Sequence, residues 1–410
     1  MISGRDIVIL SGVEWHELWQ GPHELASRLA ANGNRVLYVE NIGVRAPRWG
    51  DRARVLTRLR SWSRGLRQGG MRAVADGLWV SAPLMLPPFG SRLTRMLNRR
   101  VLVPAVARGT RRLGLRDPIV WTYLPTDTAL DLVARLRSPS SPVVYSCVSD
   151  FAERVSRCAA LERSERTLLR ECDVVFALPA LYERCARHSA RVLLDEPAVS
   201  TELFDPQASP ARPPALAGVH GPVVGYVGGL QRNLDLVLLE ALARERPDWT
   251  WVFAGPAYLP VERLARMANV RLIGALAHDE LPGAIAAFDV CISPLLLDAY
   301  TASMVPTKFG EYLAMGKPIV ATPIPYALEL ERASGGVVRT AAPCAREFAA
   351  AIERALALAA DGLTAQRCRL FAQARAWSQR MEQVSDALAQ ADRRQLAGER
   401  SQPARVGPLR

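Results

Sequence analysis

The sequence predicts an α/β protein built from two doubly wound, Rossmann-like domains that face each other across a cleft. Short apolar runs of strand length alternate with helical stretches through most of the chain, which is typical of parallel sheets covered by helices on both faces. The alternation stops once, in the proline-rich stretch 206–222, and then begins again. With 410 residues, the chain is long enough for two domains that each bury a core of their own.

The domain limits follow from this interruption. We expect a first domain at 1–205, a linker at 206–222, a second domain at 223–375, a helix at 376–391 that returns to the first domain, and a polar tail at 392–410. The first domain should have strands at 6–10, 35–40, 78–81, 118–123, 143–147 and 173–178, with a helix at 22–33. The second should have strands starting at 223, 249, 270 and 289 and helices at 233–246, 279–287, 343–361 and 363–391. Ligands of such sheets bind outside the carboxyl ends of the strands.

The segment 289–322, DVCISPLLLDAYTASMVPTKFGEYLAMGKPIVAT, has the pattern of a strand, a loop, a helix and a second strand. Pro306 suits the first position of the helix. The amides of residues 307–309 would then be unpaired at a helix N-terminus, where a phosphate can bind. Lys308 and Glu311 would project from one helix face, the first toward the phosphate and the second toward a pair of sugar hydroxyls. A surface ion pair between the two side chains explains the spacing equally well.

Lysine is nearly absent from this chain. Of the 52 basic residues, only those at 308 and 317 are lysines, which leaves 50 arginines. At a phosphate, a compact ammonium acts as a point charge, whereas a guanidinium is a rigid fork. A lysine retained in such an arginine-rich chain supports Lys308 as a phosphate ligand.

A second candidate phosphate site follows the first strand of the second domain. Gly225, Gly228 and Gly229 form a tight strand-to-helix turn, and Arg232 comes just after it. Glycine lets the backbone approach a phosphate closely. The turn lacks the spacing of the dinucleotide fingerprint and of the P-loop, so its support comes from its position at a strand end, like that of Lys308.

The first domain offers fewer candidates. Asp150 follows a strand and either faces the cleft or, with Glu153, forms a capping box for the next helix. The first strand-to-helix loop turns at Gly12 and carries His16 and His23. For a lone histidine, a structural role is the more common one.

The net charge of +12 is concentrated in the first domain. Residues 45–72 hold nine arginines and one acid, and residues 92–116 hold eight arginines and no acid. These segments together carry +16, so the remainder is net −4. Such a patch suits anionic lipid or polyphosphate, and residues 55–66 have the apolar spacing of an interfacial helix. A solvated face over a core-packed stripe explains that spacing equally well.

Composition excludes several classes of protein. At 49% hydrophobic and 22% charged, the chain is neither fibrous nor disordered overall. Its seven cysteines form no CxxC pair, and its five histidines form no ligand cluster with them, which indicates reduced thiols in a cytosol and no structural zinc. We see no signal peptide pattern and no run approaching the ~20 apolar residues that span a bilayer.

These motifs resemble the GT-B glycosyltransferases of the large retaining group that uses nucleotide sugars, family 4 in type, and especially its polysaccharide-building branch. PTKFGEYLAMGKPIVAT resembles the group's P-x-K-x-x-E-Y-L-A-x-G-K-P-V-V segment. WHELWQGPHELASRLAANGNRVLYVE resembles the W-x-x-x-W-Q-R-P-x-x-L opening of that branch, and GPVVGYVGGLQRNLDLVLLEALARERPDW resembles its second-domain opening. The similarity covers most of residues 6–390.

The resemblance implies roles for individual residues. Glu311 would hold the ribose hydroxyls, Lys308 and Arg232 the diphosphate, and the Gly228 to Gly229 turn the phosphate backbone. The implied donor-binding set also contains Gly12, Ser303, Met304, Val305 and Pro306, and the implied catalytic set is Lys308, Arg232, Asp150 and His16. Three departures concern sugar and acceptor contacts more than nucleotide contacts. Ser303 stands where the group has the first of two paired glutamates, Gly229 and Gly21 stand where it has arginines, and its run of acids is thinned to SCVSD before residue 151.

We therefore expect a metal-independent, cytosolic glycosyltransferase that moves a sugar from a nucleoside diphosphate sugar to a carbohydrate or lipid-linked acceptor in polysaccharide or glycolipid biosynthesis. It should need no cofactor beyond the donor substrate, bind no nucleic acid, and touch an anionic membrane only peripherally. Retention fits because the departing phosphate oxygen can take the acceptor proton, so no strong protein base is needed. Two alternatives stay open: a nucleotide-sugar epimerase of the same fold, and a non-catalytic binder of anionic membrane or nucleic acid.

Overall fold

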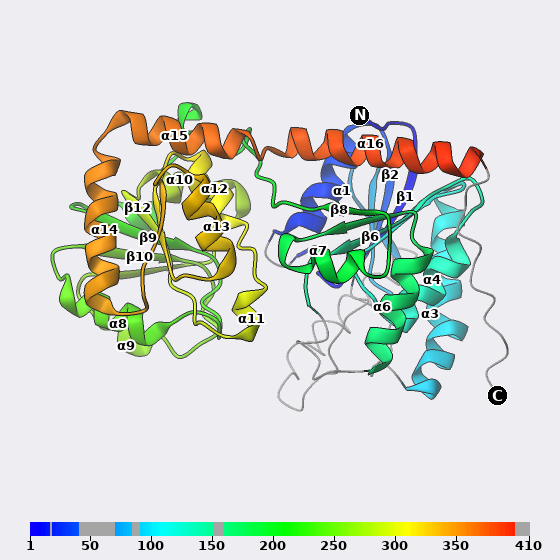
Figure 1. Cartoon of the computed structure of the whole chain (residues 1–410), viewed down its shortest axis with the longest axis horizontal. Helices are drawn as coiled ribbons and strands as arrows, with labels where there is room; N and C mark the ends of the chain where they lie inside the picture. Colours follow the sequence, from blue (N-terminus) through cyan, green and yellow to red (C-terminus); the bar gives the residue numbers. More distant parts are fainter. Residues whose placement is uncertain (17–18, 41–69, 84–90, 151–158, 398–410) are drawn as a thin grey trace. The chain divides into compact units, whose positions relative to one another are not determined.

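The computed structural model describes residues 1–16, 19–40, 70–83, 91–150 and 159–397. The chain divides into two compact units, each built on its own sheet (Figure 1). The first unit contains Met1–Asp195 and the chain from Met381 on, and the second contains Glu196–Arg380.

The sheet of the first unit has eight described strands in the order β3-β4-β2-β1-β5-β6-β7-β8. These are β1 (Asp6–Leu10), β2 (Arg35–Val39), β3 (Met71–Ala75), β4 (Leu78–Ser81), β5 (Ile119–Thr122), β6 (Val143–Cys147), β7 (Val174–Ala177) and β8 (Val192–Leu194). Only β3 and β4 pair antiparallel within this sheet. The central strand β1 is buried along its whole length, as expected for an apolar run in a parallel sheet covered on both faces.

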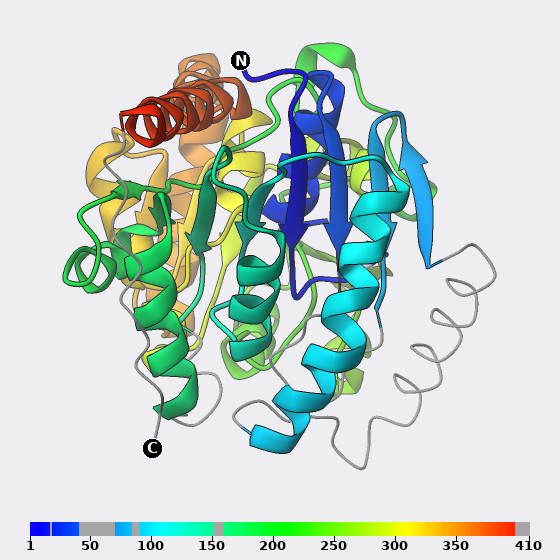
Figure 2. The ribbon, with the colours of Figure 1, turned by 90° about the vertical axis from the view of Figure 1, so that its right-hand side faces the viewer.

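Helices cover both faces of this sheet. They are α1 (Gly21–Ala31), α3 (Arg92–Arg112), α4 (Asp127–Leu136), α6 (Ala159–Glu171), α7 (Pro179–Ala186) and, from Met381 on, α16 (Trp377–Leu396). Figure 2 shows α3, α4 and α6 side by side over one face of the sheet, with α1 behind it. The first turn of α4 is capped by Thr126, whose hydroxyl accepts from the amide of Ala129 at 3.1 Å.

The sheet of the second unit has six parallel strands in the order β11-β10-β9-β12-β13-β14. They are β9 (Val223–Val227), β10 (Thr250–Ala254), β11 (Val270–Gly274), β12 (Val290–Ser293), β13 (Ile319–Ala321) and β14 (Val338–Thr340). Counted along the chain, this is the 3-2-1-4-5-6 order of a doubly wound sheet. The direction of winding reverses between β9 and β12, and ligands of such sheets bind at that point.

The remaining elements belong to the second unit. Its helices are α8 (Leu236–Glu245), α9 (Glu262–Ala265), α10 (Leu281–Ala286), α11 (Ala299–Ala302), α12 (Lys308–Ala314), α13 (Pro325–Ala333), α14 (Ala345–Ala359) and α15 (Gly362–Gln373). Short 3-10 turns lie at Pro206–Ala208, Pro214–Leu216 and His278–Glu280.

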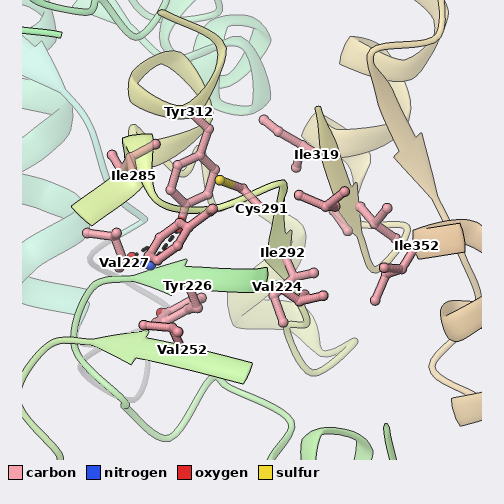
Figure 3. Packing of buried hydrophobic residues seen from close by; sticks show 14 of the residues in the cluster. Val224, Tyr226, Val227, Val252, Ile285, Cys291, Ile292, Tyr312, Ile319 and Ile352 are labelled. Atoms are coloured by element: carbon pink, nitrogen blue, oxygen red, sulfur yellow. Dashed lines mark hydrogen bonds between the residues drawn. The ribbon is translucent and has the colours of Figure 1, made fainter. Parts of the chain in front are cut away.

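The core of the second unit is closely packed around β9 (Figure 3). Gly225 in this strand has no side chain because the fully buried ring of Phe288 occupies the space that a Cβ would need. The hydroxyl of Tyr312 accepts from the amide of Val227 at 2.7 Å and thereby joins α12 to the end of β9.

The proline-rich stretch 206–222, predicted to be a linker, is part of the second unit. Leu216 is fully buried in the core. The carbonyl of Ala211 lies where a Cβ on Gly283 would stand, so this stretch packs closely against α10. The boundary between the units falls after Asp195 instead of after residue 205, because Val199, Phe204 and Leu216 pack in the core of the second unit.

The single helix predicted at 363–391 is two helices. Helix α15 ends at Gln373, and α16 begins at Trp377. In the break, Val199 donates from its amide to the carbonyl of Arg375 at 3.0 Å and accepts from the amide of Trp377 at 2.9 Å. A distant segment therefore supplies the partners that a continuous helix would have supplied.

Helix α16 also continues into the predicted polar tail, to Leu396. Asp392 forms an ion pair with Arg5 at 2.7 Å, and Ser385 accepts from the amide of Ile2 at 3.1 Å. These contacts join the helix to the chain's first strand region. In the described part of the chain, no helix is both long and apolar enough to cross a bilayer.

Candidate active site

The site lies where two neighbouring parallel strands of the second unit end. Strand β9 ends at Val227 and β12 at Ser293, so the loops after them leave the same edge of the sheet. Backbone bonds join these loops: the amide of Asp235 donates to the carbonyl of Pro294, and the amide of Leu296 to that of Asn233, both at 2.9 Å. This is the point where the winding of the sheet reverses.

Lys308, the first residue of α12, reaches back over the end of β9. Its Nζ lies 3.9 Å from the centroid of the Tyr226 ring. A Cβ on Gly228 would stand 2.6 Å from the same Nζ, so the ammonium lies directly over this glycine. The Tyr226 hydroxyl donates to the carbonyl of Gly229 at 3.3 Å. The structure thus brings Lys308 to the glycine turn, although the two are far apart in sequence.

The glycine turn is bare backbone by necessity. Gly228 has φ +128°, a conformation that favours glycine. A Cβ on Gly255, where φ is +158°, would overlap the carbonyl of Gly228. Gly229 is also confined, since its Cβ would stand 3.1 Å from the ring of Tyr258. An anion can therefore approach the backbone here without meeting a side chain from the turn itself.

Helix α12 begins later than predicted. Pro306 precedes the helix, and Thr307 is its N-cap residue. The amide of Phe309 donates to the carbonyl of Pro306 at 3.3 Å, and the amide of Gly310 to that of Thr307 at 3.0 Å. The prediction that the amides of 307–309 are all unpaired is therefore wrong for Phe309, because tight i to i−3 bonds close the first turn. The ammonium of Lys308, more than the backbone amides, makes this end attractive to an anion.

Glu311 lies in the first turn of α12, three residues after Lys308, so both project from the same side of the helix. The next residue, Tyr312, is fully buried with its hydroxyl at the Val227 amide. Burial raises the pKa of Tyr312 well above its usual value, so the phenol stays neutral. Tyr312 therefore fixes the register of Lys308 and Glu311 against β9.

The loop between β12 and α12, predicted to be polar and irregular, contains the short helix α11. Asp298 caps it by accepting from the amide of Thr301 at 2.8 Å. The Thr301 hydroxyl in return accepts from the amide of Asp298 at 3.0 Å. Such a reciprocal cap explains why this hydroxyl-rich segment is ordered.

Three predicted donor-binding residues follow this helix. The Ser303 hydroxyl donates to the carbonyl of Tyr300 at 3.1 Å. The sulfur of Met304 accepts from the side-chain amide of Asn233 at 3.5 Å, and Val305 packs against the core. These contacts are structural, and the role of the three residues in donor binding stays a prediction.

Arg232 is exposed on the loop after β9. Its guanidinium carbon lies 5.5 Å from the centroid of the Tyr300 ring, on the loop after β12. Within the described residues, neither Arg232 nor Lys308 forms an ion pair. Two cations without an acidic partner at one sheet edge make a site for an anionic ligand.

In the first unit, Asp150 forms an ion pair with Arg184 at 3.2 Å. Arg184 also pairs with Glu165 at 3.0 Å, and the hydroxyl of Tyr145 donates to Glu165 at 2.8 Å. Burial alone would lower the pKa of Arg184, but neighbouring negative groups, Glu165 first, outweigh burial and raise it. The predicted capping partner Glu153 lies outside the described residues, so the capping box stays a prediction.

The first loop of this unit holds the other candidates. A Cβ on Gly12 would stand 3.2 Å from a methyl group of Leu124, which explains the small residue. His16 Nε2 lies 2.6 Å from a guanidinium nitrogen of Arg72. Because arginine can only donate, this ring nitrogen accepts and its lone pair is already used.

His23 is structural, as predicted. It is fully buried, its Nδ1 accepts from the amide of Gln20 at 3.1 Å, and its Nε2 donates to the carbonyl of Glu14 at 3.2 Å. Among the residues that the structure describes, no group of three or more histidine, cysteine or acidic side chains could hold a metal ion.

Comparison with known proteins connects this geometry to a family. Residues 221–357 match the family described as Glycosyl transferases group 1. These residues lie within the second unit, so the likeness to this family concerns that unit. Over 249 residues, the chain is 26% identical to TuaH of Bacillus subtilis (strain 168), a protein named for teichuronic acid biosynthesis. That match covers 56% of this chain and 60% of the relative, so the chain spans about three fifths of the curated relative's length.

Solved structures of similar proteins establish the fold of the chain. Sucrose-phosphate synthase from Thermosynechococcus elongatus has a TM-score of 0.66 at 18% identity, covering 94% of this chain and 100% of that one. Anabaena Alr3699/HepE, solved in complex with UDP-glucose, has a TM-score of 0.62 at 17% identity, covering 94% and 99%. The fold is GT-B, with two Rossmann-like domains, and the predicted cleft between them stays a prediction.

The sequence of the second unit predicted the two cations, Lys308 and Arg232, but not the residues that hold Lys308 in place. Lys308 contacts the ring of Tyr226 in β9, and the Tyr312 hydroxyl accepts from the amide of Val227 at the end of that strand. Both contacts exist only because the fold places α12 beside β9. The available signal was a tyrosine one or two residues after a glycine, in GYVGG and in GEYLA. Arg184 had no comparable signal, since 34 residues separate it from Asp150.

Proposed function

We propose that the chain is a glycosyltransferase that moves a sugar from a nucleoside diphosphate sugar to a carbohydrate or lipid-linked acceptor. The observation that carries this proposal is the Lys308 ammonium lying over the bare Gly228 turn, at the sheet edge where doubly wound folds bind ligands. A diphosphate would supply the negatively charged partner that the Lys308 ammonium does not have among the described residues. The group 1 family match and the UDP-glucose bound by HepE in its own structure support the same donor class.

In this proposal, the second unit stabilises the leaving group, which is the nucleoside diphosphate. When the bond between the sugar and the diphosphate breaks, negative charge grows on the phosphate oxygen. Lys308 and Arg232 would stabilise that charge, and such a preorganised donor is worth roughly 2 to 4 kcal/mol in a catalytic site. Glu311 would orient the donor by accepting hydrogen bonds from both ribose hydroxyls. Because side-chain cations neutralise the diphosphate, we propose that no metal ion is required.

We propose retention of the anomeric configuration. The departing phosphate oxygen would take the proton of the acceptor hydroxyl on the same face of the sugar, where both are held close together. An inverting reaction would need a protein base on the opposite face. The first-domain candidates for such a base, Asp150 and His16, are engaged with Arg184 and Arg72.

We further propose a role in polysaccharide or glycolipid assembly in the cytosol. The name of the relative TuaH, which refers to teichuronic acid, and the opening motif of the first domain support a surface polysaccharide as the product class. We propose that any contact with a membrane is peripheral; among the described residues, no helix is long and apolar enough to span one.

The first test is a thermal-shift screen of the full chain against nucleoside diphosphates, with magnesium and with EDTA. We expect one base to raise the unfolding temperature, equally in both buffers. The donor class thus found is then supplied with an acceptor, and the product is analysed by NMR. A transferred sugar with the donor's anomeric configuration is expected, whereas a free epimer of the donor sugar would indicate an epimerase and an inverted linkage would refute retention.

A further inference from the structure

Helix α3 presents an apolar stripe to solvent. Leu93 is 63% exposed, Met96 41%, Leu97 36% and Val101 55%. Their spacing of three and four residues places these side chains together on one side of the N-terminal half of the helix. Contiguous exposed apolar groups on a folded protein mark surfaces that bind a protein or a membrane.

The opposite side of α3 already supplies the helix with its core contacts. Asn98, Leu102 and Val106 are buried, and the side-chain amide of Asn98 donates to the hydroxyl of Thr128 on α4 at 3.3 Å. Arg95, on the same side, forms an ion pair with Asp131 of α4 at 2.9 Å. The helix is therefore fixed to the first unit without help from the stripe, whose side chains are exposed in the described part of this unit.

Positive charge surrounds the stripe. Residues 92–116 contain eight arginines and no acid. Arg92, Arg99 and Arg100 are exposed beside the apolar side chains. The first turn of α3 contains no acidic residue although the positive end of a helix favours one, so its arginine at 92 opposes the helix dipole. Helix stability does not explain this placement.

We propose that this face of α3, defined by Leu93, Met96, Leu97, Val101, Arg92 and Arg100, docks the first unit on an anionic lipid bilayer. A bilayer surface complements both features, because acyl chains accept the apolar side chains and lipid phosphates accept the guanidinium groups. Nucleic acid would match the charge but not the apolar stripe. A second copy of the chain would match the stripe but bring its own arginines against these.

This proposal goes beyond the proposed function and does not depend on it. Binding to a membrane is measured without any donor or acceptor. Loss of transfer activity in a protein that still binds vesicles would affect only the proposed function, and loss of vesicle binding in an active enzyme would affect only this proposal. A lipid-linked acceptor would lie at the same surface.

Co-sedimentation of the full chain with vesicles tests the stripe. The wild type should bind vesicles of phosphatidylglycerol and phosphatidylcholine at low salt and bind pure phosphatidylcholine at least tenfold more weakly. Leu93→Ser/Leu97→Ser/Val101→Ser should lower binding by about a thousandfold, since each of the three apolar side chains contributes about tenfold when it is buried. The matched control is Leu363→Ser/Leu370→Ser, which changes side chains of similar exposure, 58% and 59%, on α15 of the second unit and should bind normally.

The charged part has its own pair of variants. Arg92→Gln/Arg100→Gln should weaken binding by about tenfold or more at low salt and by less at high salt, because each basic residue near an anionic surface contributes a few-fold that salt screens. Arg263→Gln/Arg266→Gln removes two exposed arginines of the second unit as a control and should bind normally. Leu97→Trp should bind more tightly than wild type, since tryptophan prefers the membrane interface.

Gel filtration and circular dichroism accompany each variant. All changed side chains are exposed, so the thermal unfolding midpoint should not move. Equal binding of neutral and anionic vesicles, or normal binding by the triple serine variant, would overturn the proposal. A concentration-dependent dimer that the triple variant loses, without vesicle binding by the wild type, would assign the stripe to a second copy and would also overturn it.

Discussion

Replacing Lys308 tests the phosphate site most directly. In the ligand-free protein, Lys308→Ala removes one partly exposed cation–π contact with Tyr226, at 3.9 Å, which is worth about 0.5 to 1 kcal/mol. In the transition state, it removes a positive charge beside the leaving diphosphate, worth roughly 2 to 4 kcal/mol. At about 1.4 kcal/mol for each tenfold, kcat/KM should fall by about 30-fold to about 700-fold. Lys308→Ala should therefore lower the activity much more than it lowers the stability of the fold.

The controls come from the chain itself. Lys317, its other lysine, donates to the carbonyl of Ala286 at 3.0 Å and does not touch the glycine turn, so Lys317→Ala should keep normal turnover. Lys308→Met keeps the length of the side chain and should lose as much activity as Lys308→Ala, since charge is what matters. Steady-state kinetics with the donor found by thermal shift, together with melting curves, measure both effects. Near-normal turnover in Lys308→Ala, or an equal loss in Lys317→Ala, would refute the assignment.

Three further predictions concern other residues. Glu311→Gln should lose discrimination between ribose and deoxyribose diphosphates, because one carboxylate accepts from two hydroxyls; equal discrimination in variant and wild type, measured by competition binding, would contradict the role. Gly228→Ala should cost about 1 to 3 kcal/mol of stability from its φ of +128° and weaken diphosphate binding, whereas Gly362→Ala, with open space around it, should leave both urea unfolding and binding unchanged. Native alkylation followed by mass spectrometry should label exposed Cys344 but not Cys368, whose pKa burial raises to about 12, so that its thiolate is scarce at pH 8; rapid labelling of Cys368 would show that its surroundings open.

The fold was largely predictable because its signals are local. Apolar strand runs and intervening helices identify a doubly wound protein without knowledge of any long-range contact. The break in the C-terminal helix was not predictable, since Val199 makes it by pairing with Arg375 and Trp377, far along the chain. The packed role of 206–222 was missed for the same reason, because proline content indicates stiffness but not what the stiff segment contacts.

The candidate site was predictable in its residue types and not in its contacts. A lysine in an arginine-rich chain and a glycine turn at a strand end pointed to Lys308 and Gly228 separately. That the ammonium lies over the glycine depends on β9 and β12 being neighbours, which is a property of the sheet order. The closing of the first turn of α12 by Phe309 depends on dihedral angles that the proline in TASMVPTKFG does not fix.

The two units differ in how their ionisable groups are used, and this difference bears on mechanism. In the first unit, Asp150 is held by Arg184, and the accepting nitrogen of His16 faces Arg72. In the described part of the second unit, Lys308 and Arg232 have no acidic partner. In an enzyme that depended on a strong protein base, we would expect a carboxylate or imidazole without an arginine partner. We would also expect cations such as Lys308 and Arg232 to be paired with acidic side chains. The opposite arrangement occurs here, and it suits a reaction whose main requirement is to stabilise the negative charge of a departing phosphate while that phosphate itself accepts the proton.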